Sequence, residues 1–215
     1  ARSALAEIGA ATEVEAAVEP SERERPVGLA DLLAALARAG LADIPTPEAL
    51  AELATEARAD FDVLNATYTL LHRGGRFDVV ELNEDHHPID YDRVVARLAA
   101  ASHGGIAATD IQQVVATDAS GTPLHHDVYL SVVGRDTPFE HRFTNVDWYD
   151  LREIMEWLNA VLAELGAPDR FERLYLEAGE HVAVACVPPG ALRYLHESVG
   201  LPLAEQLDPD RALTI

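Results

Sequence analysis

The stretch IQQVVATDASGTPLHHDVYLSVVGRDTPFEHRFT, residues 111–144, decides the fold class, because apolar and polar residues alternate along it with a period of two. Two turn sequences, DASG and GRD, divide it into runs over residues 111–117, 124–133 and 138–144. Strands that are joined by such short turns pair antiparallel. The stretch therefore predicts a three-stranded antiparallel meander.

The segment that follows changes to a helical period. Residues 147–165, DWYDLREIMEWLNAVLAEL, repeat apolar side chains at helical spacing, with Asp147 as the expected N-cap and Gly166 as the stop. Two more strands, FERLYLE and HVAVACV, and a last helix from Pro189 come next. The C-terminal part is thus predicted to run β-β-β-α-β-β-α.

The part before the meander is predicted to be helical. Apolar spacing predicts helices over residues 29–36 and 90–102, and it predicts either one long helix or two with a break near Asp60 from Pro47 to about residue 71. A strand over residues 66–71 is a rival interpretation, because β-branched and aromatic residues occur there.

Together these patterns predict an α+β fold: N-terminal helices followed by an antiparallel sheet with helices packed on one face. We expect a helical N-terminal region over residues 1–75 and an α+β domain over residues 76–215, or one continuous unit from about residue 27.

Composition limits the function classes. The chain of 215 residues has 16 basic and 37 acidic residues, a net charge of −21, and this charge repels nucleic acids and anionic membranes. A single Cys rules out an internal disulfide, and no apolar run reaches the roughly 20 residues that cross a bilayer. The start of the chain does not resemble a signal peptide. We expect a cytoplasmic protein without a cofactor, whose partner is another protein.

An acidic stretch and an aromatic pair are the candidate partner-binding residues. The stretch DVVELNEDHHPIDYD, residues 78–92, contains six acids and two histidines but no base. The pair begins the helix predicted from residue 147, where it either anchors a partner or packs in the core. The candidates are Glu81, Glu84, Asp85, Asp90, Asp92, Trp148 and Tyr149.

A divalent metal site is the alternative, since carboxylates and imidazoles are common ligands. Alternation along the second strand places His126 on the face of Val128 and His125 on the opposite face, and His141 lies on the next strand. The HExxH and CxxC spacings are absent from the sequence, and Cys186, within VAVACV, fits a buried structural thiol. The candidate ligands are His86, His87, His125, His126 and His141, with Glu84 and Asp85.

The segment FTNVDWYDLREIMEWLNAVLAELGAPDRFERLY, followed by VAVACVPPGALRYLHESVGLPL, resembles small acidic α+β proteins of bacteria, the immunity proteins that neutralise secreted toxins. The similarity covers roughly residues 90–203 and does not include the helical stretch over residues 1–75. It implies a non-enzymatic immunity or antitoxin-like protein that masks a basic site on a partner, such as a toxin. The alternatives are a metal-dependent hydrolase that uses the histidines above, and a structural or regulatory subunit that assembles through its N-terminal helices.

Overall fold

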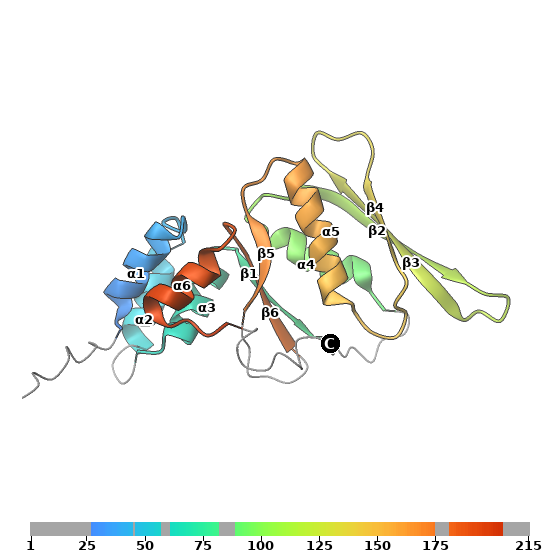
Figure 1. Cartoon of the computed structure of the whole chain (residues 1–215). Helices are drawn as coiled ribbons and strands as arrows, with labels where there is room; N and C mark the ends of the chain where they lie inside the picture. Colours follow the sequence, from blue (N-terminus) through green and yellow to red (C-terminus); the bar gives the residue numbers. More distant parts are fainter. Residues whose placement is uncertain (1–26, 45, 57–60, 82–88, 175–180, 204–215) are drawn as a thin grey trace, which may run out of the picture.

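The computed structural model describes residues 27–44, 46–56, 61–81, 89–174 and 181–203, which form helices and two antiparallel three-stranded sheets (Figure 1). The α+β class is therefore confirmed. The helices are α1 (Leu29–Arg38), α2 (Pro47–Glu56), α3 (Val63–Arg73), α4 (Tyr91–Ala100), α5 (Leu151–Glu164) and α6 (Ala191–Val199). The strands are β1 (Phe77–Glu81), β2 (Ala108–Thr117), β3 (Pro123–Val132), β4 (Phe139–Phe143), β5 (Arg170–Leu174) and β6 (His181–Val187).

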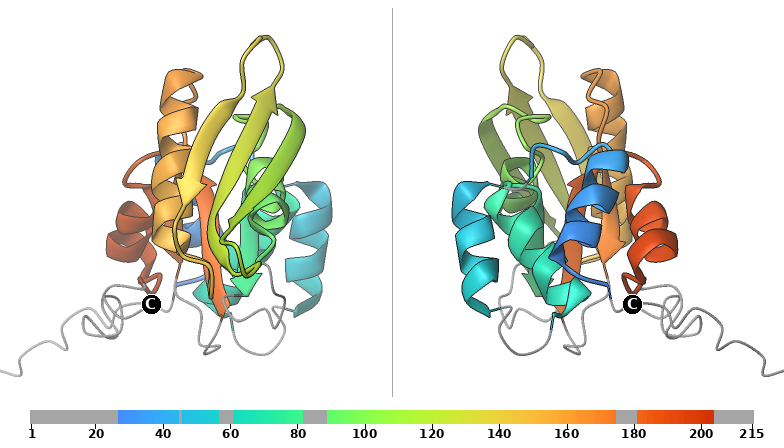
Figure 2. Two further views of the ribbon diagram at one scale, coloured as in Figure 1. Left: turned by 90° about the vertical axis from the view of Figure 1, so that its right-hand side faces the viewer. Right: turned by 90° about the vertical axis from the view of Figure 1, so that its left-hand side faces the viewer.

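The predicted meander is present as sheet B, with strand order β2-β3-β4. Val128 at its centre pairs with Gln113 of β2 and His141 of β4. Burial alternates along β3, where Val128, Leu130 and Val132 face the core. The other face of sheet B is turned toward solvent, as is usual for one side of an antiparallel sheet (Figure 2, left).

The remaining strands form a separate sheet A, with order β1-β6-β5, whereas the sequence pattern predicts a single sheet. Its central strand β6 sends Val182, Val184 and Cys186 into one hydrophobic core and Ala183, Ala185 and Val187 into another. A strand that is apolar at every position needs cover on both faces, so sheet A lies between two helical layers.

Strand β1 is not among the elements that the sequence predicts, because its residues FDVVE overlap the acidic stretch over residues 78–92. Asp78 occupies a strand position because Arg97 of α4 neutralises it, with Nη2 donating to Asp78 Oδ1 at 2.7 Å. The same Nη2 lies 2.6 Å from the carbonyl oxygen of Val79. A long-range ion pair thus makes an acidic residue compatible with an edge strand.

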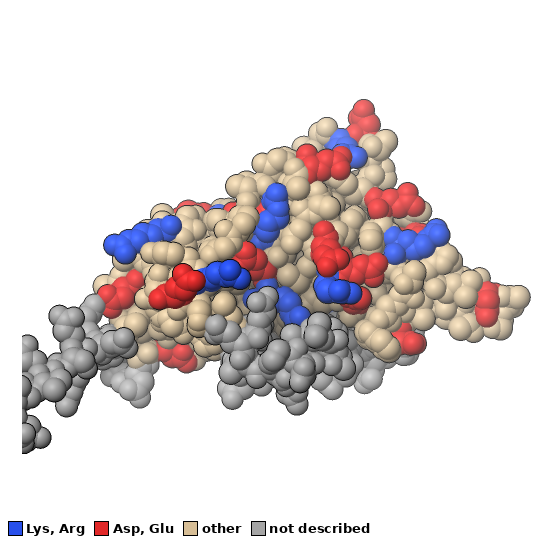
Figure 3. All heavy atoms as spheres, in the orientation of Figure 1, with Lys and Arg blue, Asp and Glu red and all other residues tan. Residues whose placement is uncertain are grey.

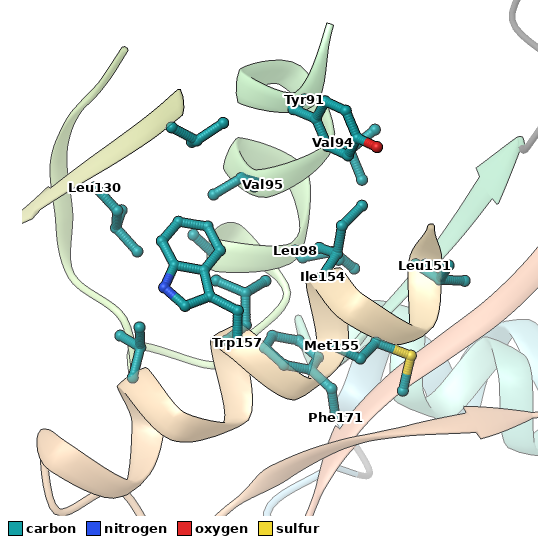
Figure 4. Packing of buried hydrophobic residues seen from close by; sticks show 14 of the residues in the cluster. Tyr91, Val94, Val95, Leu98, Leu130, Leu151, Ile154, Met155, Trp157 and Phe171 are labelled. Carbon is teal, nitrogen blue, oxygen red and sulfur yellow. The ribbon is translucent and has the colours of Figure 1, made fainter. Parts of the chain in front are cut away.

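The elements stack in four layers, seen from left to right in Figure 1: the helices α1, α2, α3 and α6, then sheet A, then α4 and α5, then sheet B. Figure 4 shows Ile154 and Trp157 of α5 pointing toward α4, where Val95 and Leu98 lie. As predicted, Leu158 is buried on the same face of α5. This layer of two helices joins the two sheets into one core.

The structure settles two local details of the helices, the N-cap of α5 and the rival strand over residues 66–71. Helix α5 begins at Leu151 and is capped by Asp150, whose side chain accepts a hydrogen bond from the N–H of Glu153 at 3.0 Å, so Asp147 is not the cap. The strand expected as a rival over residues 66–71 lies in helix α3, where Thr67 donates its hydroxyl to the carbonyl of Val63. Here the apolar face with Leu70 and Leu71 outweighs the strand propensity of the local residues.

A buried arginine ties the layers together. The guanidinium of Arg76 donates to Asp169 at 2.5 Å, to Asp43 at 3.0 Å and to the carbonyl oxygen of Cys186 at 3.3 Å. Asp43 also lies 3.3 Å from Nε2 of His103. Because these residues belong to loops before β5 and after α1 and to strand β6, the network fixes the N-terminal helices against sheet A. In the described part of the chain, no helix has the length and apolar character needed to cross a membrane.

Candidate functional site

The structure brings together two predicted site segments that are far apart in the sequence, the N-terminus of α4 and the turn before α5. The hydroxyl of Tyr149 donates to the carbonyl oxygen of Asp90 at 3.3 Å. In the other direction, the hydroxyl of Tyr91 lies 3.1 Å from the carbonyl oxygen of Asn145 and 3.4 Å from that of Trp148. Each segment therefore supplies a tyrosine that binds the backbone of the other.

The two predicted aromatic anchors have different environments. Tyr149 is buried and packs edge to face on Tyr91, with ring centroids 5.4 Å apart. Trp148 is 55% exposed. Only Trp148 is therefore placed to contact a partner, and Tyr149 holds the turn that carries it.

The backbone around Trp148 is held by the side chain of Asn145, whose Oδ1 accepts hydrogen bonds from the N–H of Asp147 at 3.2 Å and of Trp148 at 3.4 Å. A turn with both its backbone amides and its carbonyls bound loses little conformational entropy when the exposed indole contacts another protein. The sequence does not single out Asn145, and the apolar spacing along residues 90–102 places Tyr91 on the core face of its helix. An Asn shortly before a helix start is a local signal for such a turn, because its side chain can accept a hydrogen bond from the backbone two residues on.

Carboxylates lie on the same segments as the indole. Asp147 is exposed, and Asp90 and Asp150 are half-buried at the N-termini of α4 and α5. Asp150 also caps its helix, so its carboxylate has a structural role. We call Asp90, Asp147, Trp148 and Asp150 the Trp148 surface.

The structure describes only some of the other acidic candidates for partner binding. Asp92 is half-buried in the first turn of α4, where its N–H donates to Oε1 of Gln113 at 3.2 Å. Glu81 ends strand β1 and pairs with His181. Four candidates lie outside the described residues: Glu84, Asp85, His86 and His87.

His126 is fully buried on the core face of β3, as the alternation predicted. Gln113 donates its Nε2 to Nδ1 of His126 at 3.0 Å and to the carbonyl oxygen of Ile89 at 2.6 Å. Nε2 of His126 has no hydrogen-bond partner among the described residues, and the ring lies 5.3 Å from that of Tyr91. Burial, together with the charge of His125, lowers the pKa of His126, so the imidazole is held neutral.

The other two described histidines of the metal alternative point elsewhere. His125 is on the solvent face of sheet B, 3.5 Å from Asp127. His141 lies on the core face, where its Nε2 is 3.0 Å from Glu153 and its ring stacks on Trp157 at 5.4 Å. In the part of the chain that the structure describes, no three His, Cys, Asp or Glu side chains come together as a metal site.

The charges on the molecular surface are mixed. On the face drawn in Figure 3, carboxylates are interspersed with arginines, so the coloured residues there do not form one continuous acidic patch. Ion pairs explain part of the pattern: Arg142 pairs with Asp127 at 2.7 Å, and Arg135 with Glu164. The acidic character of the protein is therefore a property of the whole chain more than of this face.

The sole cysteine is part of the core. Cys186 is fully buried on β6, and burial raises the pKa of its thiol to about 12. A thiol of this kind is not a nucleophile at neutral pH.

Comparison of the chain with protein-family models, curated proteins and solved structures gives no match.

Proposed function

We propose that this protein is a non-enzymatic binding protein that masks a basic site on a partner protein, in the manner of an immunity protein or antitoxin. The observation that supports it best is the exposed indole of Trp148 on a turn that two buried tyrosine hydroxyls and Asn145 hold in place. As part of the same proposal, we place the protein in the cytoplasm, where a single reduced thiol such as Cys186 is ordinary.

An exposed tryptophan on a rigid turn has the properties of a binding hot spot. Trp is enriched among the few residues that supply most of the binding energy at interfaces. It buries a large area, and only two side-chain torsions must be ordered. The turn beneath Trp148 is already fixed, so the contact requires little further ordering.

The carboxylates beside the indole favour a cationic partner. An Arg or Lys side chain that lies over the indole of Trp148 gains a cation–π interaction, and Asp147 on the same turn offers an ion pair. At longer range, the net charge of −21 attracts a basic surface and raises the association rate. A basic cleft, as found on enzymes that act on nucleic acids, fits these features.

The test begins with affinity capture from the source cells, using the wild-type chain and Trp148→Ala as paired baits. We expect a basic protein to be enriched by the wild type and to be depleted with Trp148→Ala. Leu165→Ala is the matched control, because Leu165 is an exposed apolar residue at the opposite end of α5. Equal capture by all three baits would show that the Trp148 surface is not the binding site.

Binding kinetics of the captured partner separate the contact made by Trp148 from the electrostatic steering by the acidic residues. Trp148→Ala should raise the dissociation rate by roughly 30-fold or more, the size of a hot-spot loss of about 2 kcal/mol, and leave the salt dependence unchanged. Replacing Glu84 and Asp85 by Arg should instead slow association and weaken its dependence on ionic strength. A partner that is acidic, or an association rate that ignores the charge reversal, would contradict electrostatic steering.

A further inference from the structure

Strand β2 is an open edge of sheet B. It is ten residues long and pairs with β3 on one side only, and no other described strand lies on its second side. In an antiparallel strand, alternate backbone N–H and C=O groups point toward each side, so half of those on β2 are directed away from β3. Figure 2 (left) shows β2 at the margin of the sheet with α4 behind it.

Strand β2 is less protected against pairing than the other edge strands: its ten residues carry one charge, Asp110, and its register shifts lie only near its two ends. Strands β1, β4 and β5 have five residues each, and every one carries at least two charged side chains. Natural proteins blunt sheet edges in this way, with short strands, charges, prolines and bulges. Residues 111–117, IQQVVAT, contain no charge and no proline, and Val114 in their middle is 52% exposed.

A groove runs beside this open edge, between β2 and α4. Its volume is about 660 Å³, within the range of protein ligand sites. On the helix side the groove is lined by three alanines of α4, Ala96, Ala99 and Ala100, and by Asp92 and Arg93 near the helix N-terminus. The strand side is formed by the segment from Ile106 to Ile111.

Three charged residues line the groove. Asp92 belongs to the first turn of α4, Asp110 to β2, and Arg93 to α4. Asp110 is exposed and accepts a hydrogen bond from Gln112 at 2.6 Å, whereas Asp92 is half-buried and accepts one from the N–H of Arg93 at 2.7 Å. The balance is acidic, and the net charge of the chain has the same sign.

We propose that the open edge of β2 and the α4 groove bind an extended segment of a partner protein, which adds to sheet B as a fourth strand with an Arg or Lys side chain between Asp92 and Asp110. Backbone hydrogen bonds to β2 provide the affinity, and alternate side chains of the segment lie over the alanines of α4. A second copy of this chain is a poor occupant, because two chains of charge −21 repel each other. The inference rests on the proposed function only in that the occupant comes from a basic protein partner.

A random seven-residue peptide library displayed on phage and selected against the full chain tests this inference. We expect enriched peptides to carry Arg or Lys within a run of β-branched and small residues. A synthetic copy of the most enriched peptide should shift the backbone amide NMR signals of residues 107–114. The inference would be overturned if the library yielded no binder or only acidic binders. It would also be overturned if the synthetic peptide shifted only the NMR signals of residues outside 107–114.

Three variants locate the contact with the same peptide. Ala96→Trp fills the groove from an exposed helix position and should weaken binding at least tenfold, while Ala160→Trp, at an exposed position of α5, should not. Asp110→Asn should weaken binding and reduce its salt dependence. The melting temperature of each variant confirms that it folds.

The same peptide distinguishes this inference from the proposed function. Trp148→Ala should leave its affinity unchanged, because Trp148 does not line the groove. A peptide that loses affinity with Trp148→Ala and keeps it with Ala96→Trp would refute the groove and leave the proposed function standing. A peptide that binds the groove, combined with a protein partner insensitive to Trp148→Ala, would refute only the role of the Trp148 surface.

Discussion

The hydroxyl of Tyr149 donates a hydrogen bond to the backbone carbonyl oxygen of Asp90, 3.3 Å away, and so joins the turn before α5 to the N-terminus of α4. Tyr149→Phe removes the donor and leaves the part-buried carbonyl of Asp90 with one partner fewer. We expect the free energy of unfolding in urea to fall by about 0.5 to 1.5 kcal/mol. Tyr129→Phe, on the solvent face of sheet B, is the control and should change stability less. Equal losses would mean that the Tyr149 hydroxyl does not fix the turn.

Leu158 is fully buried between α5 and the two sheets. Leu158→Ala should lower the free energy of unfolding by about 2 to 5 kcal/mol, because it leaves a cavity that the surrounding side chains fill only in part. Leu165, at the C-terminal cap of α5, is 37% exposed, and its replacement by Ala should cost much less. Chemical denaturation of the three proteins measures both losses. A small loss at Leu158 would place this face of α5 outside the core.

His126 makes stability depend on pH. Its pKa in the folded protein is lowered, first by burial and then by His125, so between the folded pKa and the ordinary value of about 6.5 the unfolded state binds more protons. Above about pH 6.5 the titration of His126 therefore does not lower the free energy of unfolding. As the pH decreases through this window, the free energy of unfolding falls. We expect His126→Phe to flatten the decrease between pH 7 and pH 5, measured as urea midpoints. An unchanged slope would show that other groups dominate the titration.

Cys186 should be inert in the folded protein. Because burial raises the pKa of its thiol to about 12, a thiol reagent at pH 8 should label the native chain far more slowly than the chain in denaturant. Cys186→Ala should leave partner binding intact, since the thiol packs inside the core cluster of β6. Rapid labelling of the native protein, or a loss of binding without a loss of stability, would contradict a purely structural role.

Local sequence determined the elements whose apolar period is long and regular. The alternation around Val128 and Leu130 predicted both the meander and the burial of His126, because a strand exposes each face to a single environment. The spacing of Leu151, Ile154 and Leu158 likewise predicted α5 and its buried face. These signals are encoded within about ten residues, so the sequence alone contains them.

Only the tertiary structure decided how these elements combine. Strand β1 exists because β6 supplies its hydrogen bonds and Arg97 neutralises Asp78, and both partners lie outside the segment itself. The approach of Asp90 to Tyr149, 59 residues later, depends on two helices packing side by side. The sequence indicated acidic and aromatic residues as candidates for partner binding. It could not show that Trp148 is exposed while Tyr149 is buried. Adjacent residues in an irregular turn carry no periodicity, so their exposure is set by the distant groups that pack against them.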